Sequence, residues 1–413
     1  MRTAPEGGPS SIRRRSTLWP GRTTCALVDL DAIAHNVGAL RRHVAPAALM
    51  TVVKGNAYGH GLVAVARAAV EAGASWLGVY TAGEGARLRS GGIDARILVL
   101  GPFTAAEAET MLAIELTPTL STAESVHILA GLVASGTVPV HVEVDTGMTR
   151  AGVARSHLLE LLDTIRSAES LLCEGLFTHL AGAGFPGERS AVEQLRVFRE
   201  LLDDVTAAGH TIPLVHAANS AGALNFPEAY LSMVRVGIST YGYYPSRESE
   251  RTVRLHPALT LRSAVIRVDS VPPGTGVGYN HDFVAERPST IALVPIGYAD
   301  GLHRTLGIAH GRVLIRGRSA PIVGRVSMDQ ITVDATEVPG ISVGDDVIVI
   351  GQQGGARQSA DDVAEAAGTI SYEVLSALLP RVPRVYLRGG RVVDVLSDDP
   401  LESRSQRLDR GRE

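Results

Sequence analysis

The first part of the chain repeats a pattern in which apolar runs are followed by stretches with helical spacing. After Asp31, apolar residues from Ile33 to Val44 recur at intervals of four, three and four, which marks one face of a helix. Eight β-rich runs then follow, and helical stretches separate most of them. These runs cover residues 48–53, 76–80, 96–100, 116–120, 140–144, 174–180, 214–219 and 233–238.

Eight strands with helices between them predict a parallel (β/α)₈ barrel of the TIM type. An open, doubly wound sheet is the alternative, and the count of eight disfavours it. After about His256 the pattern changes to strand-like segments that follow one another with turn signals, which predicts a mostly β second domain. In that part we expect one helical stretch, at 360–368, and a closing strand at 384–395.

These patterns divide the chain into a barrel at 24–255 and a β domain at 256–396. Residues 1–23 contain arginines without an apolar segment behind them, so we expect a disordered N-terminal extension and not a signal peptide. Residues 397–413 form a polar tail.

Composition narrows the possible functions. With 413 residues, 45% hydrophobic residues and a formal net charge of −4, nothing indicates a nucleic acid or an acidic partner. Two cysteines, Cys25 and Cys173, are too few for a disulfide framework and fit a reducing compartment. No apolar stretch reaches membrane-spanning length, so we expect no membrane segment. Because no signal peptide is expected either, we expect a cytoplasmic protein.

In a (β/α)₈ barrel the chemistry lies at the C-terminal ends of the strands. Each polar residue found there has an ordinary explanation, such as a solvated charge, a core histidine or a tight turn. Their joint occurrence at one rim favours an active site. The strand ends carry Lys54, Asp145, Thr146, Arg150, His179, Asn219, Ser220, Arg235, Gly237 and Ile238.

Two parts of this set indicate a specific chemistry. A lysine between apolar strand residues loses solvation, so its pKa falls and its amine can form a Schiff base with an aldehyde cofactor. Ser220 and the pair Gly237-Ile238 are placed where backbone N–H groups can approach a phosphate.

Taken together, the motifs resemble those of alanine racemase, a family of pyridoxal 5′-phosphate enzymes. They are VVKGNAYGHG, VDTGMTRAG, FTHLAGA, HAANSAG, VRVGISTYG, PIGYADG, VGRVSMDQ and TISYE, in the family's order over about residues 24 to 396. The resemblance implies a barrel domain and a β domain. It also implies a head-to-tail homodimer in which each active site borrows residues from the partner's β domain.

The resemblance also implies individual roles. Lys54 looks like the lysine that holds the cofactor and acts as a base on one substrate face, and Tyr298 looks like the opposite base, supplied to the partner subunit's site. Arg235 is similar to the arginine that faces the pyridine nitrogen. The phosphate set would be Tyr58, Ser220, Gly237, Ile238 and Tyr372, the substrate-carboxylate contacts Arg150 and Met328, and the supporting or ring-side groups His179 and Asn219. No metal site is assigned.

These roles make physical sense, because racemisation removes the α-proton from one face and returns it to the other. Two bases on opposite faces of a planar carbanion are the simplest device. The ordinary pKa of tyrosine is about 10, so a Tyr298 phenolate needs positive neighbours, for which His179 and Arg235 are candidates. Arginine keeps its proton, so Arg235 would leave the ring nitrogen unprotonated and disfavour transamination. A buried core tyrosine is the alternative for Tyr298.

Two positions depart from the family pattern. Glu143 stands where the family commonly has a carbamylated lysine that braces the carboxylate-binding arginine. We expect Glu143 to supply that negative charge directly and to brace Arg150 by a charge-assisted bond. Ser327 stands where many relatives have cysteine, which affects only the substrate's immediate surroundings.

Alanine racemisation, supplying D-alanine for peptidoglycan, is the function that the resemblance favours. The nearest alternative is a serine or broad-specificity racemase of the same fold, because a methyl difference is worth only about 1–3 kcal/mol. A decarboxylase with a related barrel is disfavoured by GYADG and GRVSMDQ. A non-catalytic cofactor carrier is disfavoured by the β domain that contains Tyr298 and Met328.

Overall fold

The computed structural model describes residues 22–308 and 310–398. Most of the extension expected at 1–23 and most of the tail expected at 397–413 lie outside the described residues. The described chain forms two compact units. The first, the barrel unit, is Leu30–Ala258. The second, the sheet unit, combines the segment before Leu30 with the residues from Leu259 onward.

The barrel unit contains eight parallel strands, each within or overlapping one predicted run, so the predicted barrel is confirmed. Their spatial order is β10-β2-β3-β4-β5-β6-β8-β9. The strands are β2 (Ala48–Val52), β3 (Trp76–Val79), β4 (Arg96–Val99), β5 (Thr117–Leu120), β6 (Val138–Asp145), β8 (Leu171–Phe177), β9 (Leu214–His216) and β10 (Met233–Val236). A short strand, β7 (Val153–Ala154), pairs with β6.

Backbone hydrogen bonds bring the two ends of this sheet together. The N–H of Ser232 donates to the carbonyl of Val215, and the N–H of Arg235 donates to that of Ala218, each at 2.9 Å. Inside the ring of strands, an apolar cluster of buried side chains fills the core. It consists of Met50, Trp76, Leu98, Phe177 and Met233.

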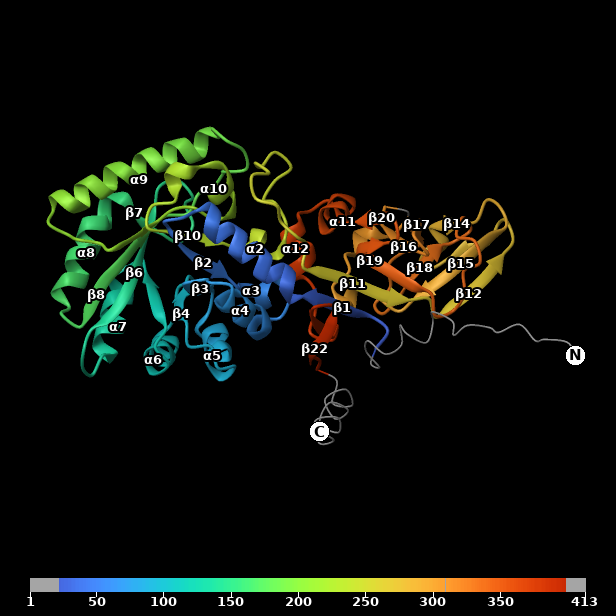
Figure 1. Ribbon diagram of the computed structural model, residues 1–413, viewed down its shortest axis with the longest axis horizontal. Coiled ribbons are helices and arrows are strands. Elements are labelled where there is room, and N and C mark those ends of the chain that lie inside the picture. The colour runs from blue at the N-terminus through green and yellow to red at the C-terminus, as the bar shows by residue number, and fades with distance from the viewer. Residues whose placement is uncertain (1–21, 309, 399–413) are drawn as a thin grey trace, which may run out of the picture. The chain divides into compact units, whose positions relative to one another are not determined.

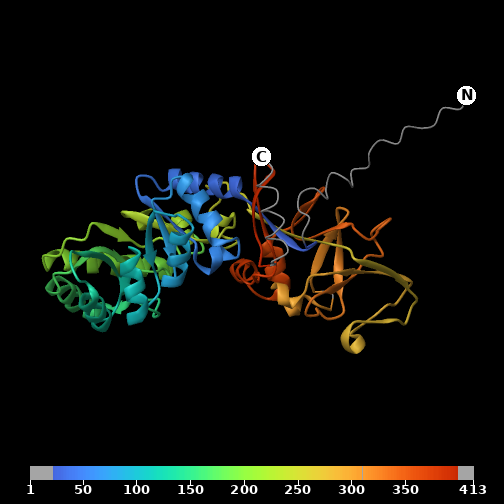
Figure 2. The same ribbon diagram turned by 90° about the horizontal axis from the view of Figure 1, so that it is seen from below.

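Helices cover the outside of the strands, as Figures 1 and 2 show from two directions. The predicted face of the first helix is confirmed, because Ile33, Val37 and Leu40 are buried. Thr104 and Thr122 cap two of the helices through their side chains. The helices are α2 (Leu30–His43), α4 (Leu62–Glu71), α5 (Ala82–Ser90), α6 (Ala105–Ala113), α7 (Ala123–Leu132), α8 (Leu158–Ser167), α9 (Arg189–Ala207) and α10 (Ser220–Asn225).

The sheet unit is built on a mixed sheet in which most neighbouring strands are antiparallel. Its strands are β1 (Cys25–Asp29), β11 (Leu259–Ala264), β12 (Arg267–Val271), β15 (Ser289–Val294), β16 (Arg312–Ile315), β17 (Arg318–Val323), β18 (Ile331–Asp334), β19 (Asp346–Gln353), β20 (Ala356–Gln358), β21 (Arg384–Arg388) and β22 (Arg391–Leu396). A separate two-stranded sheet pairs β13 (Gly276–Val277) with β14 (Phe283–Val284). Two helices, α11 (Ala360–Ala367) and α12 (Ser371–Ser376), complete the unit.

Three local expectations differ from the structure. The segment from residue 24, expected in the barrel, contains β1, which pairs with β11 and β21 in the sheet unit. The strand expected at 384–395 is a hairpin, because Gly389 and Gly390 have positive φ and turn the chain back. A second helix, α12, follows the one expected at 360–368. A strand's apolar pattern specifies neither its sheet nor its partner.

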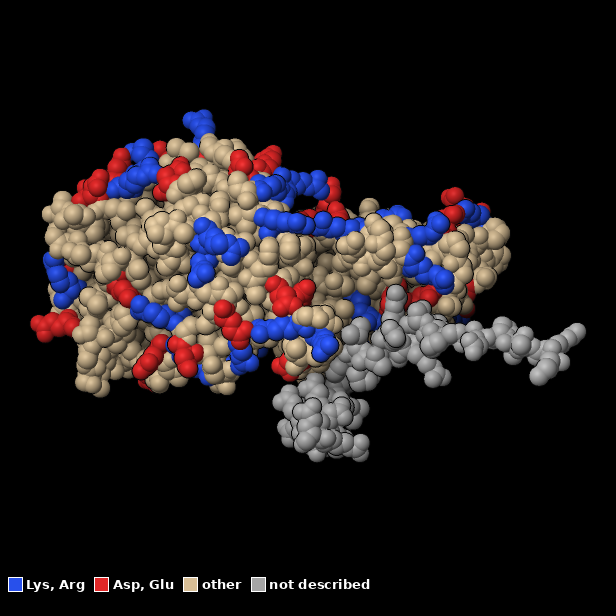
Figure 3. Space-filling view, in the orientation of Figure 1, with Lys and Arg blue, Asp and Glu red and all other residues tan. Residues whose placement is uncertain are grey.

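Within the described part of the chain, no helix has both the length and the apolarity needed to cross a bilayer. On the face in Figure 3, basic and acidic side chains are interspersed over each unit.

Candidate active site at the ends of the barrel strands

Lys54 lies two residues beyond the end of β2 and begins an unusual turn. The turn, α3 (Lys54–Tyr58), has φ between 48° and 63° at residues 55–58, three of which are not glycine. It is therefore a single left-handed turn. Left-handed helical geometry costs roughly 1–2 kcal/mol per non-glycine residue, so surrounding contacts must hold it in place.

Side chains from the turn and from α5 supply these contacts. Glu84 accepts the N–H of Gly55 at 2.6 Å through one carboxylate oxygen and the N–H of Tyr80 at 2.8 Å through the other. Asn56 accepts the N–H of Leu62 at 3.0 Å through its own side chain. One carboxylate thus ties the lysine turn to the end of the neighbouring strand β3, which fixes the backbone next to Lys54.

The surroundings of Lys54 favour a neutral amine. Burial lowers its pKa most, and the positive charge of Arg150 lowers it further, with a smaller effect from Arg235. Glu84 and Glu143 act in the opposite direction without reversing the shift. A lysine with a lowered pKa has a larger fraction of free amine at neutral pH, which suits a nucleophile or a base.

Arg235, on β10, is only 3% exposed and is held by several groups. Its Nη1 lies 2.9 Å from His216 Nδ1, and its Nη2 donates to the carbonyls of Thr178 and Ala217 at 2.9 and 3.2 Å. Nη2 also lies 3.4 Å from His179 Nδ1. Burial lowers the pKa of Arg235 to about 10, so it remains a cation at neutral pH. These contacts do not use Nε.

The sequence places His179 inside the end of the sixth predicted strand. In the structure it lies two residues beyond β8, which ends at Phe177. Burial, followed by the charges of Arg235, Arg150 and Lys54, lowers its pKa to about 3. His179 is therefore neutral at pH 7. The expectation that it provides a positive neighbour for Tyr298 was wrong, because burial disfavours a charged ring and the nearby cations disfavour it further.

The residues expected to bind a phosphate in the barrel unit lie together. The Oγ of Ser220 accepts the N–H groups of Gly237 and Ser239 at 2.9 and 3.4 Å. A Cβ at Gly237 would lie 2.5 Å from the hydroxyl oxygen of Tyr58, so only glycine allows this approach. Burial raises the pKa of Tyr58 to about 12, so the phenol keeps its proton.

Asn219 and Ile238 frame this cluster. Asn219 caps α10, since its side-chain oxygen accepts the N–H of Gly222 at 3.0 Å and its amide donates to the carbonyl of Leu180 at 3.3 Å. Both polar ends of Asn219 thus hold the backbone that presents the neighbouring serine. Ile238 is fully buried and begins the short helix η3 (Ile238–Tyr241).

Strand β6 carries the acidic residues of the site. Glu143 is 6% exposed, and burial raises its pKa against the opposing charges of Arg235 and then Arg150. Arg150 itself is exposed. No hydrogen bond joins Glu143 to Arg150 among the described residues, so the expected brace stays a prediction. Asp145 accepts the N–H groups of residues 147–149 and shapes its own loop.

The remaining expected site residues belong to the sheet unit. Tyr298 begins the short helix η5 (Tyr298–Asp300), and its N–H donates to the carbonyl of Ser327 at 3.1 Å. The N–H of Ala299 donates to the carbonyl of Met328 at 2.9 Å, so the two loops lie side by side. Tyr298 is 40% exposed and Met328 is 54% exposed. Tyr372 is half-buried in α12.

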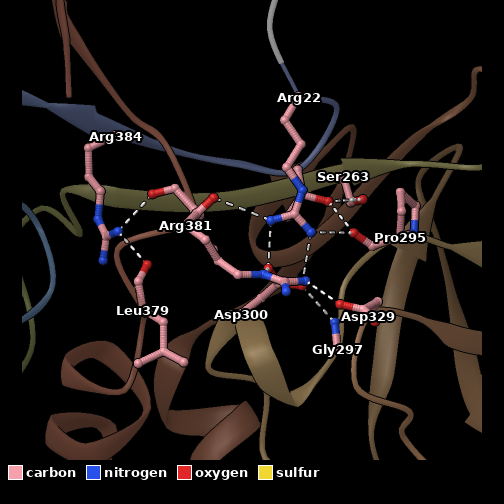
Figure 4. Close-up of polar contacts among 11 residues, drawn as sticks. Arg22, Ser263, Pro295, Gly297, Asp300, Asp329, Leu379, Arg381 and Arg384 are labelled. Carbon is pink, nitrogen blue, oxygen red and sulfur yellow. Dashed lines mark hydrogen bonds and ion pairs between the residues drawn. The ribbon is translucent and has the colours of Figure 1, made fainter. Parts of the chain in front are cut away.

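A buried carboxylate fixes both loops (Figure 4). Asp300 accepts hydrogen bonds from Arg22 at 2.6 and 3.1 Å, from Arg381 Nε at 2.7 Å and from the N–H of Gly297 at 2.9 Å. Arg381 also donates to Asp329, next to Met328, at 2.7 Å. Burial alone would raise the pKa of Asp300, but hydrogen bonds from the two arginines lower it below its usual value.

Comparison with known proteins agrees with this arrangement. A model of the alanine racemase N-terminal domain matches residues 28–245, and a model of the C-terminal domain matches residues 258–386. The alanine racemase of Halothermothrix orenii is 40% identical over 368 residues, which are 88% of this chain and 97% of that protein. The alanine racemase of Desulfosudis oleivorans is 42% identical over 381 residues, 88% and 96% of the two chains.

The chain belongs to the alanine racemase family.

Solved structures of alanine racemases have the same fold. That of Bacillus anthracis, with bound L-Ala-P, aligns with a TM-score of 0.86 and 38% identity over 91% of this chain and 98% of that one. That of Bartonella henselae, with covalently bound pyridoxal phosphate, has a TM-score of 0.81 and 31% identity, and the match covers 89% of this chain and 100% of that one. The two matched family models cover both units, so the C-terminal part of the family is present as well as the barrel.

Sequence reasoning missed two groups of residues in this alanine racemase family member. One is the set of arginines around Asp300, which come from distant parts of the chain and leave no local signal. The other is the pair His141 and His216, whose rings are in hydrogen-bond contact with each other and, through His216, with Arg235. A signal for it existed, because the run HVEVD alternates polar residues along a strand that is otherwise apolar. A further signal, for a residue that was found, is that Lys54 is the only lysine in the chain.

Proposed function

We propose that the protein interconverts L-alanine and D-alanine with pyridoxal 5′-phosphate held by Lys54. The observation that carries the proposal is the setting of this lysine. It is the sole lysine, it follows the first barrel strand on a strained turn, and its pKa is lowered by burial and by Arg150. Every other Lys or Arg position in the chain is arginine, so Lys54 supplies the only lysine side-chain amine for an aldehyde.

The residues present fit the phosphate of the cofactor. Because Ser220 Oγ already accepts two N–H groups, its hydroxyl hydrogen is left to donate to an anion. Tyr58, with a pKa of about 12, is also a donor at neutral pH. The absence of a side chain at Gly237 lets the Tyr58 hydroxyl lie against the backbone beside Ser220. These three groups support phosphate binding, with Ile238 and Tyr372 as further expected members.

Arg235 would face the pyridine nitrogen. As a cation with donors only, it offers a hydrogen bond and no proton, which keeps that nitrogen unprotonated. Pyridoxal phosphate supplies, when bound, an electron-withdrawing ring that takes up the electron pair of the Cα–H bond. By keeping the pyridine nitrogen unprotonated, Arg235 would favour prompt return of the proton over side reactions.

The proton would be handled by two side chains. Lys54 acts on one face of the substrate as a free amine, which its lowered pKa favours. Tyr298 acts on the other face, from the partner subunit. Arg150, exposed beside the site, and Met328 would contact the substrate carboxylate. Glu143 supplies a buried negative charge between Arg235 and Arg150, in place of the family's carbamylated lysine.

A homodimer with shared sites is part of the proposal. An exposed apolar surface favours a protein partner. Of the well-exposed large side chains of the sheet unit, four belong to the loops of Tyr298 and Met328 or lie next to α12. They are Tyr298, Met328, Ile370 and Leu379. The N–H of Leu379 donates to the carbonyl of Asp300 at 3.3 Å, so three of the four belong to one bonded loop cluster. Sedimentation should give a dimer, and a fully active monomer would contradict this.

The absence of any other lysine makes the main test simple. Borohydride reduction in the presence of pyridoxal phosphate should add a single cofactor mass to the intact protein, and peptide mapping should place it on Lys54. A Lys54→Arg variant is the matched control and should gain no adduct. A colourless protein that takes up no cofactor and leaves L-alanine unchanged would overturn the proposal.

The alternative substrate is serine or a broader set of amino acids. Initial rates on L-alanine, L-serine and L-lysine at equal concentration separate these cases, and we expect L-alanine to be the best substrate. We further propose that the reaction takes place in the cytoplasm and supplies D-alanine for peptidoglycan precursors. Cell fractionation that finds the enzyme elsewhere would contradict this location.

A further inference from the structure

A line of polar side chains runs through the barrel interior from Arg235. His216 Nδ1 lies 2.9 Å from Arg235 Nη1, and His216 Nε2 lies 2.9 Å from His141 Nδ1. His141 Nε2 then lies 3.8 Å from an oxygen of Glu174. The four residues come from β10, β9, β6 and β8. The proposed reaction gives no task to His216, His141 or Glu174, although both histidines are fully buried.

The direction of every hydrogen bond in this line follows from Arg235. A guanidinium has donors only, so His216 Nδ1 must accept. A neutral imidazole carries one proton, and in His216 this proton is therefore on Nε2, which donates to His141 Nδ1. The proton of His141 is then on Nε2, which faces the Glu174 carboxylate. One cation thus fixes the tautomers of two rings in series.

The charges along the line agree with this assignment. Burial lowers the pKa of His216 and of His141, so both rings are neutral at pH 7. Contact with His141 is the largest cause that holds the pKa of Glu174 at about 2, and Arg96 adds to it. The far end is therefore a carboxylate. At 3.8 Å, His141 and Glu174 interact electrostatically over a distance longer than a normal hydrogen bond.

Two local features create room for the line. Val140 pairs with Cys173, whereas His141 pairs with Gly175, so Glu174 is an extra residue that bulges out of β8. Such bulges re-aim a side chain. A Cβ at Gly175 would lie 2.4 Å from His141 Nδ1, so glycine is required for the ring to occupy this place.

Arg96 anchors the far end of the line. It donates two hydrogen bonds to Glu174, at 2.7 and 2.6 Å, in the bidentate geometry that fixes a carboxylate best. Its guanidinium carbon lies 3.9 Å from the centroid of the Trp76 ring, and that ring lies 5.2 Å from His141. The carboxylate that faces His141 is therefore held in one orientation.

We infer that His141 and Glu174 are positioning residues that act on Arg235 through His216. The inference rests on the proposed function, in which Arg235 faces the cofactor ring. Arg235 sets the tautomers of both rings, and Glu174 holds the outer, Nε2–H side of His141 in place. The acceptor nitrogen of His216 then sets the rotation of the Arg235 guanidinium. This rotation in turn sets the direction in which the other N–H groups of Arg235 point. Linked hydrogen bonds also polarise one another in a low-dielectric interior.

Nitrogen NMR of the full-length protein, labelled with ¹⁵N-histidine, tests this directly. At pH 7 we expect His216 and His141 each to be a neutral ring with its proton on Nε2. The signal that disappears in a His141→Phe variant belongs to His141. A protonated Nδ1 or an imidazolium at either residue would overturn the inference. This result does not depend on catalysis, whereas absence of a cofactor on Lys54 would refute the proposed function alone.

A pair of matched variants tests the effect on catalysis. Glu174→Gln removes the anchoring charge while Arg235 still sets the tautomers, so we expect a changed ¹⁵N shift of His141 and a loss in kcat on the order of 10-fold at unchanged KM. Glu193→Gln is the control, because Glu193 pairs with Arg196 on α9 and contacts no histidine of the line. It should behave as wild type. An unchanged ¹⁵N shift of His141 together with an unchanged kcat in Glu174→Gln would contradict the positioning role.

Discussion

The two units present their candidate site residues in opposite ways. In the barrel unit, Arg235 and Glu143 are 3% and 6% exposed, and their partners belong to the same unit. In the sheet unit, Tyr298 and Met328 are 40% and 54% exposed. The barrel therefore shifts pKa values by burial and by neighbouring charge, whereas the sheet unit presents side chains to another surface.

Both units nevertheless fix the backbone next to the reactive group with a carboxylate. Glu84 holds the left-handed turn after Lys54, and Asp300 holds the turn that begins at Tyr298. The difference lies in the side chains, since Lys54 is half-buried among charged neighbours whereas Tyr298 is exposed on a rigid support. Such a division suits an active site completed by a second subunit, because precise placement is needed on both sides.

Replacing either proposed base should have the largest effect. Lys54→Arg keeps a positive charge but removes the amine, so we expect a loss of at least about 10³-fold in kcat together with loss of covalent cofactor. Tyr298→Phe should lose activity by a similar factor while the cofactor stays attached. Chiral chromatography of the product and the absorption spectrum distinguish the two. A Tyr298→Phe enzyme with normal kcat would remove the sheet unit from the chemistry.

Mixing these two inactive variants sharpens the comparison. If each site combines the barrel unit of one subunit with the sheet unit of another, a mixed dimer contains one intact site and one doubly defective site. After dissociation and random reassembly, about one quarter of the wild-type activity should return for a twofold-symmetric dimer. No recovery, with mixed dimers shown by mass spectrometry, would place both bases of a site on one chain.

Asp300→Ala should weaken the sheet unit by about 3 kcal/mol, because two arginines would lose a buried charge partner. Denaturant unfolding followed by hydrogen exchange can assign the loss to this unit. Glu337→Gln breaks an exposed pair with Arg287 and serves as the control, expected to change stability by less than about 0.5 kcal/mol. Equal effects of the two variants would mean that Asp300 is not a structural clamp.

Gly175→Ala should destabilise the barrel unit by about 2 kcal/mol, since the new methyl group overlaps the His141 ring. Gly131→Ala is the control, because nothing lies within 4 Å of its added Cβ and it stands inside α7. That change should stabilise slightly, by about 0.5 kcal/mol. Thermal unfolding of both variants gives the comparison, and a neutral Gly175→Ala would contradict the tight fit around His141.

The most gradual expected effect is a pH dependence in the barrel unit. His179 has a pKa of about 3 in the folded protein, against about 6.5 when unfolded. Below pH 6.5 the unfolded chain binds a proton that the folded chain does not, so stability is lost as pH falls toward 3. The slope for one group approaches about 1.4 kcal/mol per pH unit. A His179→Gln variant should show a correspondingly shallower loss in urea unfolding between pH 6 and 4.

Much of the barrel was predictable from local pattern, because strand and helix periods appear directly in the sequence. The rim residues Lys54, Arg235 and Ser220 could be found from their positions at strand ends. Glu174 could not be predicted, since it faces His141 only because of a bulge that depends on pairing between two strands. The neutral state of His179 likewise depends on burial and on cations brought by other strands.

The sequence by itself determined the order of strands and helices, the single lysine after the first strand and the family resemblance. The tertiary structure alone decided that β1 joins the sheet unit, that the lysine turn is left-handed and that Asp300 gathers Arg22 and Arg381. The physical reason is the distance along the chain over which each feature is determined. Periodicity records which face of an element is apolar, whereas partners far apart in the chain meet only after folding, and burial then sets their charges.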